Sequence, residues 1–467
     1  MPIIRSISGL RATLVEGIFD ENLIYLYITS LIKLYPEGKF VIGRDGRPSG
    51  IAMQEFIAKI MTYYNREFIL IGLVPTPTVQ LIVEEVGAVC GISITASHNP
   101  AEWNGLKFIN SNGVFFDAAE NQKVWDIIDS QKLISIPKEI YNIDISNLPI
   151  KNDWAIDTHI NKILNLQSNN TNFIQNINFN LELVKAKEFR VVVDAVNASG
   201  SFIIPQLLQN MGCTVFRLNC EGNGDFTHKP EPLPENLTEL AEAVVSMNAD
   251  VGIAVDPDGD RLVIIDENGK PIGEENSIVL AVWSYLKNHN NPENVKVVVN
   301  HSTTQNVEYV AKMFNAKVER SPVGEINVVN KMKEIDAEIG GEGSGGIILR
   351  DFHLGRDAVS GIYLLMNFLA QNSVSLSTII NKLPKTHIKK VKIEFSHPIE
   401  EIAPQIKNLF KTEKCIEEDG LKFIGEDYWL QIRKSNTEPI IRIISEGTND
   451  NPPTNLIDKV FSIIKHY

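Results

Sequence analysis

The sequence lacks several features that mark whole classes of protein. Its cysteines, Cys90, Cys213, Cys220 and Cys415, form no CxxC pair, and a chain of 467 residues does not depend on a disulfide framework. No apolar run is long enough for a membrane-spanning helix, and the N-terminus has no apolar segment of signal-peptide length. We therefore expect free thiols, no membrane contact and a cytoplasmic location.

An excess of positive charge is also missing. The formal net charge is -14 at pH 7, and an acidic protein repels the phosphate backbone of nucleic acid. The hydrophobic share of 43% is ordinary for a soluble globular protein, and the length predicts three or four domains. The composition thus favours a small-molecule partner over nucleic acid, and it indicates no oligomeric state.

One local pattern occurs three times along the chain: a short apolar strand, a polar turn and then a helix. The strands begin near Phe40, Val191 and Val295. Such units are typical of α/β domains with largely parallel, buried sheets. Their spacing of roughly 100 to 150 residues predicts three similar domains rather than a short-period repeat.

The C-terminal part follows another pattern, with strands at 391–395, 428–433 and 440–445 and helices at 398–410 and 455–466. This predicts a small α+β domain. The chain is therefore expected to form three α/β domains with mixed, mostly parallel sheets and a smaller C-terminal domain. The predicted domains are 1–145, 150–267, 268–380 and 385–467.

The segment Thr95–Pro100 places a hydroxyl, an imidazole and an amide in one short loop after an apolar strand. Asn99 and Pro100 favour a tight loop that exposes the hydroxyl of Ser97. No GxSxG motif is present, so an acyl-transfer serine is not predicted. Phosphorylation of Ser97 would add a charge of about -1.5 to -2. The alternative is an ordinary structural serine.

A second loop carries three carboxylates. Asp256, Asp258 and Asp260 follow the apolar strand Val251–Val255. Hard oxygen ligands at alternate positions of a turn suit Mg²⁺. An EF-hand does not fit, because Arg261 stands where that motif requires glycine. Beside a metal loop, Arg261 is expected to bind a phosphoryl oxygen. The alternative is a solvated acidic turn.

Two further loops are rich in small or polar residues. Gly340–Gly346 contains five glycines, which permit close approach to a ligand, and Glu342 and Ser344 in it can bind sugar hydroxyls. Arg433–Pro439, with Arg442 after it, combines cations, hydroxyls and an amide, as a phosphate site does. A polar surface hairpin is the alternative for this last loop.

Two cations of the first domain complete the set. Arg11 falls in the small-residue segment Ser8–Ala12, interpreted as a turn, and Lys107 follows Asn104-Gly105, a turn signal. A lysine whose pKa is lowered by desolvation can donate or accept a proton. Taken alone, each residue would be interpreted as a surface cation.

Together these loops resemble the α-D-phosphohexomutase family, and the resemblance spans nearly the whole chain because each loop falls in a different quarter, in the family's order. It implies a fold of three similar α/β domains and a smaller fourth domain around a central cleft. It also implies reversible phosphoryl transfer between C1 and C6 of a phosphohexose, with Mg²⁺ and a hexose 1,6-bisphosphate intermediate. Within the family the expected substrate is a glucosamine phosphate, with mannose and glucose phosphates as alternatives.

The resemblance also implies a role for each candidate residue. Ser97 matches the phosphoserine, which binds Mg²⁺ together with Asp256, Asp258 and Asp260. Arg261 matches the residue that contacts this phosphate, and His98, Lys107 and Arg11 match acid/base or charge-stabilising positions. Glu342 and Ser344 match the sugar loop, and Arg433, Ser435, Asn436, Thr437 and Arg442 match the site of the non-reacting phosphate.

The sequence departs from the family where Gly346 replaces a histidine found in many bacterial members, which leaves the sugar preference open. Two other classes of function remain. A haloacid-dehalogenase-like phosphatase would use Asp256 as its nucleophile, and a sugar-phosphate sensor would bind without turnover.

Overall fold

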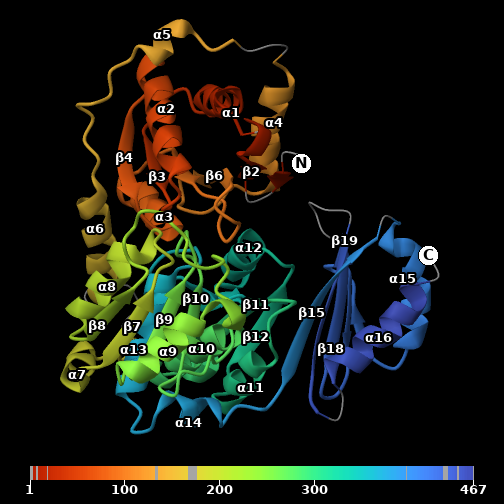
Figure 1. The fold of residues 1–467 in the computed structure, drawn as a ribbon. Coiled ribbons are helices and arrows are strands. Elements are labelled where there is room, and N and C mark those ends of the chain that lie inside the picture. The colour runs from red at the N-terminus through yellow and green to blue at the C-terminus, as the bar shows by residue number, and fades with distance from the viewer. Residues whose placement is uncertain are drawn as a thin grey trace.

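The computed structural model describes residues 4–6, 9–17, 19–131, 135–166, 176–395, 397–434, 440–449 and 452–465. It forms four β-sheets, each with its own helices (Figure 1). No helix in these ranges combines the length and apolar character that a membrane span requires.

The first sheet has the strand order β1-β2-β6-β5-β3-β4. Strand β3 is parallel to β4 and β5, whereas β6 is antiparallel to both β5 and β2. Apolar side chains of α1 and α2 pack on one face, and those of α3 join a core that continues into the next two sheets. The elements are β1 (Ile4–Ser6), β2 (Gly9–Thr13), α1 (Glu21–Leu34), β3 (Phe40–Arg44), α2 (Ser49–Tyr63), β4 (Phe68–Leu73), α3 (Thr76–Glu85), β5 (Cys90–Ile94), β6 (Trp103–Asn110), α4 (Ala118–Asp129) and α5 (Lys138–Tyr141).

The second sheet has the order β10-β9-β7-β8, with β7 parallel to β8 and β9 and with β10 antiparallel to β9. Strand β7 contains three consecutive valines that are buried, as expected for a strand covered on both faces. The elements are α6 (Asn152–Leu164), α7 (Leu181–Lys187), β7 (Arg190–Asp194), α8 (Gly200–Asn210), β8 (Thr214–Leu218), α9 (Thr238–Ser246), β9 (Val251–Val255) and β10 (Leu262–Ile265).

The third sheet repeats this arrangement in the order β12-β11-β13-β14. Helix α13 is buried along its whole length, because it is apolar on every side and lies between neighbouring elements. The elements are α10 (Glu275–Asn288), β11 (Lys296–Asn300), α11 (Asn306–Met313), β12 (Lys317–Ser321), α12 (Glu325–Ile335), β13 (Ile339–Glu342), β14 (Gly346–Leu349), α13 (Ala358–Ala370) and α14 (Leu376–Ile380).

The fourth sheet is antiparallel throughout, in the order β15-β19-β18-β17-β16, and α15 and α16 pack together on one face. The other face is turned toward the third sheet (Figure 1). The elements are β15 (His387–Glu394), α15 (Ile399–Leu409), β16 (Lys414–Ile416), β17 (Leu421–Ile424), β18 (Trp429–Lys434), β19 (Ile440–Gly447) and α16 (Pro453–Ile464).

The predicted fold class is confirmed, because three mixed, mostly parallel sheets precede an antiparallel C-terminal one. The exact domain boundaries stay a prediction. Two local predictions were wrong. Arg11 lies in strand β2, and Asn104-Gly105 lies in strand β6. Gly105 is needed for close packing rather than for a turn, since a Cβ there would stand 2.5 Å from the carbonyl oxygen of Leu10.

Candidate active site

The Ser97 loop begins where β5 ends. Ser97 has a φ of 54°, a left-handed conformation that a non-glycine residue adopts only when its surroundings impose it. Its backbone N–H donates to Oγ1 of Thr95 at 2.8 Å, and that hydroxyl donates to Asp45 Oδ2 at 2.7 Å. This buried chain of hydrogen bonds fixes the direction in which the Ser97 side chain leaves the loop.

Arg47 also binds this loop, and its side chain is fully buried. Its guanidinium donates to the carbonyl oxygens of Ser97, Asn99 and Pro100, each at 2.6 Å, and of Trp103 at 3.1 Å. Sequence reasoning missed Arg47, although it stands in the polar turn after the first predicted strand. A buried cation that satisfies four carbonyls gives the loop one conformation.

The carboxylate loop joins β9 to β10. Asp256, Asp258 and Asp260 are buried, and one oxygen atom from each lies within 4.8 Å of the others. Oδ1 of Asp256 accepts the N–H groups of Asp260 and Arg261, both at 3.2 Å. Gly259, with a φ of 65°, makes the turn that places the three side chains on one side.

The donor set fits a divalent cation. Lys107 Nζ donates to Asp258 Oδ2 at 2.5 Å, and Arg356 donates to Asp260 Oδ2 at 2.6 Å. The second oxygens, Asp258 Oδ1 and Asp260 Oδ1, are buried and have no hydrogen-bond partner among the described residues. Unpartnered buried carboxylate oxygens are costly, and Mg²⁺ prefers such ligands.

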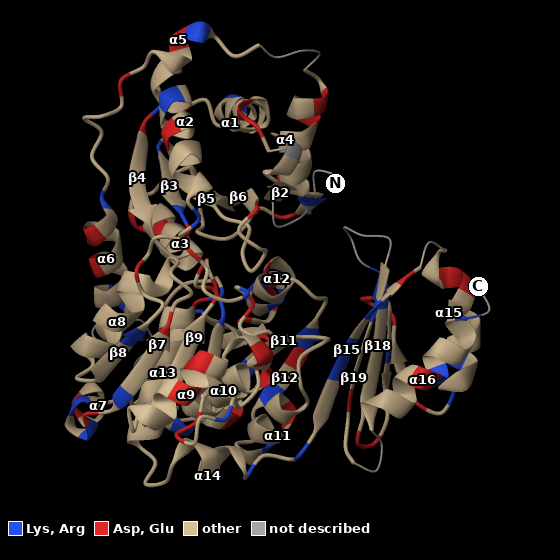
Figure 2. Cartoon of the chain, viewed as in Figure 1, with Lys and Arg blue, Asp and Glu red and all other residues tan. Residues whose placement is uncertain are grey.

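The serine and carboxylate loops come from different sheets and meet. Ser97 Oγ lies 3.4 Å from Asp256 Oδ2, although 159 residues separate them. The N–H of Thr76, at the start of α3, donates to the carbonyl oxygen of Asp258 at 2.8 Å. Helix α3 of the first domain therefore fastens the carboxylate loop against the serine loop. Figure 2 shows acidic and basic segments meeting in this region.

The remaining cations surround the serine. Arg261 donates to His98 Nδ1 at 3.0 Å, and the same nitrogen lies 3.4 Å from Ser97 Oγ. Arg11, half-buried in β2, donates to the side-chain oxygen of Asn99 at 3.2 Å. The structure therefore brings Ser97, His98, Lys107, Arg11 and Arg261 around the three aspartates.

The electrostatics of the centre follow from these contacts. The charge of Arg261, then burial and then Arg11 hold the pKa of His98 well below its usual value. Burial raises the pKa of Asp256, and the neighbouring Asp258 and Asp260 raise it further. Burial opposes ionisation of Asp258 too, but the charge of Lys107 outweighs it and lowers the pKa. Nδ1 of His98 thus carries no proton, since it accepts from Arg261 and an arginine only donates.

The glycine-rich loop connects β13 to β14. Glu342 ends β13 and is buried, where it accepts from Asn300 at 2.7 Å, from the N–H of Gly324 at 3.0 Å and from Arg356 at 2.6 Å. Ser344 is partly buried in the turn that follows. A bridge between Arg261 and Gly346 joins this loop to the carboxylate loop.

The last candidate loop connects β18 to β19. Arg433 and Arg442 face each other across these strands, and Lys392 of β15 pairs with Arg442 on the other side. Directly paired residues point to the same face, so three cations stand in one row. Ser435, Asn436 and Thr437 lie outside the described residues.

The fourth sheet is fastened to the third by a buried carboxylate. Glu446 accepts from Thr304 Oγ1 at 2.6 Å, Gln305 N at 2.8 Å, Thr386 Oγ1 at 2.7 Å and Trp429 Nε1 at 2.6 Å. Four donors to one carboxylate fix how the row of cations is presented toward the loops of the third sheet.

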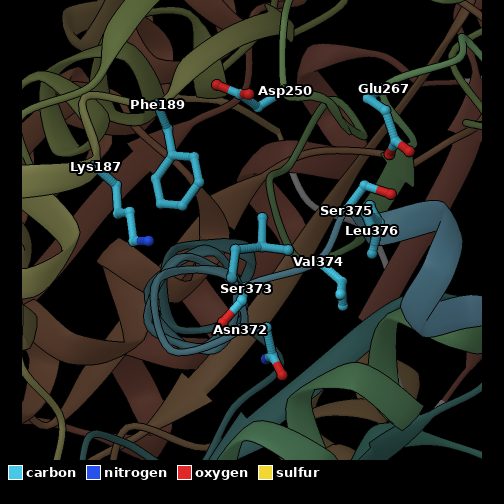
Figure 3. Close-up of a pocket in the computed structure, with 10 residues that line it drawn as sticks. Lys187, Phe189, Asp250, Glu267, Asn372, Ser373, Val374, Ser375 and Leu376 are labelled. Carbon is cyan, nitrogen blue, oxygen red and sulfur yellow. The ribbon is translucent and has the colours of Figure 1, made fainter.

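A cavity elsewhere is a poor alternative site. Figure 3 shows Phe189, Asp250, Glu267 and Val374 around it. Phe189 and Asp250 precede β7 and β9, so the cavity lies at the amino ends of these strands, whereas ligands of open α/β sheets bind at the carboxyl ends. It also contains none of the clustered carboxylates.

Comparison with known proteins agrees with the geometry. Residues 4–134, 170–269 and 274–387 match, in turn, domains I, II and III of the family described as phosphoglucomutase/phosphomannomutase, alpha/beta/alpha. The phosphoglucosamine/phosphogalactosamine mutase of Sulfurisphaera tokodaii is 29% identical, over 97% of this chain and 98% of its own. The phosphoglucomutase/phosphomannomutase of Thermococcus kodakarensis is 32% identical, over 95% and 94%.

A solved structure of a phosphoglucomutase/phosphomannomutase family protein from Burkholderia thailandensis superposes with a TM-score of 0.77 at 20% identity, covering 99% of this chain and 96% of its own. An Aspergillus fumigatus N-acetylphosphoglucosamine mutase in complex with GlcNAc-6P and magnesium gives a TM-score of 0.59 at 12% identity, with 99% and 95% covered. At these identities the likeness is one of fold. The matched domains and relatives show that this chain belongs to the α-D-phosphohexomutase family and is a phosphohexomutase.

Proposed function

We propose that this enzyme moves a phosphoryl group reversibly between C1 and C6 of a hexose phosphate through a phosphorylated Ser97. The observation that carries the proposal is the position of Ser97 Oγ, 3.4 Å from a carboxylate of a buried cluster suited to a divalent cation. A phosphoryl group on that oxygen would sit between the cluster and the cations Arg261 and Arg11.

In the proposed reaction, a free sugar hydroxyl attacks the phosphorus of phosphoserine. The new P–O bond forms to the sugar oxygen as the bond to Ser97 Oγ breaks, which yields a hexose 1,6-bisphosphate. His98, whose Nδ1 lies beside Ser97 Oγ, or Lys107 would accept the hydroxyl proton, and the departing Ser97 Oγ takes up a proton in exchange. Mg²⁺ held by Asp256, Asp258, Asp260 and the phosphoserine would supply charge neutralisation on the transferring group.

The bisphosphate then turns end for end and returns its other phosphoryl group to Ser97. The non-reacting phosphate must be held away from the serine in both orientations. Arg433 and Arg442 are paired on the fourth sheet, whose face away from its helices is turned toward the third sheet, and with Ser435, Asn436 and Thr437 they are proposed to bind it. Glu342 and Ser344 are proposed to bind the sugar hydroxyls.

Trapping the covalent intermediate tests the proposal. The enzyme is incubated with ³²P-labelled hexose bisphosphate, quenched in acid and treated with hydroxylamine. The label should stay on the protein, because a phosphoserine resists hydroxylamine whereas an aspartyl phosphate does not. Loss of the label would favour the phosphatase alternative with Asp256 as nucleophile. Ser97→Ala should abolish labelling and turnover, whereas Ser130→Ala, an exposed serine of the same domain, should do neither.

For the sugar, we propose glucosamine phosphate as the preferred substrate. The Sulfurisphaera tokodaii relative and that of Methanococcus maripaludis, also 29% identical, both carry this activity in their names. The comparison of kcat/KM for the 1- or 6-phosphates of glucosamine, glucose and mannose tests it. A higher kcat/KM for a glucose or mannose phosphate would make that sugar phosphate the preferred substrate instead. Binding without any turnover in the presence of Mg²⁺ and a bisphosphate would favour a sensor.

A further inference from the structure

Arg356 stands where three loops meet. It lies between β14 and α13, and its side chain is largely buried. Besides Asp260 Oδ2 and Glu342 Oε2, both at 2.6 Å, it contacts Glu325 Oε2 at 3.1 Å. One guanidinium thus joins the carboxylate loop, the glycine-rich loop and the start of α12. Its role did not emerge from the sequence, because its partners are distant along the chain.

The chain makes room for this side chain at Gly346. A Cβ at that position would stand 2.2 Å from Cδ of Arg356 and 3.0 Å from Cγ. The glycine is therefore required for space. The backbone next to Arg356 is fixed as well, since the N–H of Asp357 donates to the carbonyl oxygen of Ile347 at 2.8 Å and the Asp357 side chain caps α13.

Because of this contact, the two carboxylate oxygens of Asp260 have different surroundings. Oδ2 is taken by Arg356, and Oδ1 is buried without a hydrogen-bond partner among the described residues. A guanidinium binds carboxylates in a fixed planar geometry, so it orients the group that it holds. Partners that orient metal-binding carboxylates change metal affinity by about 10- to 100-fold when they are removed.

Arg356 acts on the glycine-rich loop in the same way. Burial opposes ionisation of Glu342, but the charge of Arg356 outweighs it and lowers the pKa, together with the hydrogen bond from Asn300. Glu325 behaves differently, because burial raises its pKa to about 7 despite the nearby Arg356. Arg356 therefore contacts three carboxylates, and Asp260 and Glu342 are the nearer two, at 2.6 Å against 3.1 Å for Glu325.

We propose that Arg356 is a positioning residue, which aims Asp260 at the cation and Glu342 at the sugar. The inference rests on the proposed function, since it assigns this residue to the same centre. The competing interpretation is that Arg356 only balances the charge of the acidic cluster. The two interpretations predict opposite signs, because removing a cation that merely repels Mg²⁺ would strengthen Mg²⁺ binding.

The experiment is titration calorimetry of Mg²⁺ into the whole enzyme and into Arg356→Met. We expect Mg²⁺ binding to weaken by about 10- to 100-fold, and the KM for the hexose phosphate to rise with it. Unchanged or tighter Mg²⁺ binding would overturn the inference. Arg350→Met is the matched control, since it removes a cation from the same segment whose carboxylate partners are Asp336 and Asp351.

Two further variants keep every charge. Gly346→Ala would force the Arg356 side chain aside, so it should also weaken Mg²⁺ binding. Arg356→Lys should bind Mg²⁺ more tightly than Arg356→Met but more weakly than wild type. If Arg356→Met fails to fold, as judged by circular dichroism, Gly346→Ala and Arg356→Lys decide the matter, and wild-type affinity in both refutes the inference. Wild-type enzyme that binds no Mg²⁺ would instead refute the cation site of the proposed function and the inference with it.

Discussion

The guanidinium of Arg47 donates to the carbonyl oxygen of Ser97 at 2.6 Å, from a position fully shielded from solvent. It also forms a buried ion pair with Asp45 at 3.0 Å. The residue proposed to carry the phosphoryl group is therefore held in its left-handed conformation by a cation that is shielded from solvent.

Replacing this cation should damage both stability and chemistry. Arg47→Met removes the ion-pair partner of Asp45 and the side-chain donor to several loop carbonyls, and breaking a buried ion pair costs about 3 to 5 kcal/mol. Urea unfolding should show this loss, and labelling of Ser97 should slow. Arg44→Met is the control, because within the described part of the chain Arg44 donates to the carbonyl oxygen of Asp45 alone, and it is less buried. Equal effects of the two substitutions would contradict the assigned role of Arg47.

Metal removal should be visible without an activity assay. Three buried carboxylates repel one another, so a cation that binds only the folded protein raises its stability, by about 2.7 kcal/mol at a hundred times the Kd. Mg²⁺ should therefore raise the thermal midpoint of chelator-treated enzyme and restore turnover.

The controls use two aspartates of the same strand-loop unit. Asp256→Asn should abolish the thermal response to Mg²⁺, whereas Asp250→Asn, before β9, should keep it. A response that persists in Asp256→Asn would show that the cation binds elsewhere.

The proposed site for the non-reacting phosphate predicts a change in binding. A hydrogen bond to a charged group contributes about 1.5 to 3 kcal/mol, so Arg433→Ala should raise KM about 10- to 100-fold and change kcat less. Lys389→Ala serves as the control, because Lys389 lies on β15 but contacts Thr454 of α16, on the other face of the sheet. An unchanged KM in Arg433→Ala would exclude Arg433 from phosphate binding.

Lys422 predicts a pH dependence of stability. Burial, followed by the charge of Arg320, lowers its pKa from 10.5 to about 6, and its Nζ donates to the carbonyl oxygen of His301. Between these values the unfolded chain binds a proton that the folded protein does not, so the free energy of unfolding rises with pH. From pH 7 to 9.5 this contribution is at most about 3 kcal/mol.

Lys422→Met should remove that rise, which urea unfolding at both pH values measures against wild type. Lys414→Met, an exposed lysine of the neighbouring strand β16, should leave it unchanged. If the variant at position 422 keeps the wild-type slope, Lys422 is charged in the folded protein.

The fold class could be predicted because its signals are local. Apolar strands such as β7 and β11 are followed at once by polar turns and helices, and each such unit has few ways to pack. The same holds for the Ser97 and Asp256 loops, whose residue types lie side by side in the sequence. Their roles remain proposals. Their meeting in space follows because both loops lie at the carboxyl ends of strands and because Thr76 of α3 holds the second sheet's loop against the first.

Other parts of the site could not be predicted because they depend on distant partners. Arg356 and Arg47 also bind groups that lie far along the chain, and the polar turn in which Arg47 stands does not reveal which groups its side chain reaches. Gly105 was misinterpreted as part of a turn because a glycine required for close packing of two strands has the same local signature as one required for a turn.

Ser97 and its neighbouring aspartates belong to two sheets that are held together by Thr76 of α3, so the proposed centre exists only while both are docked. A chain severed between α5 and α6 would leave the hydroxyl on one fragment and the carboxylates on the other. Neither fragment alone would contain the complete centre, and activity would return only when the two fragments reassociate.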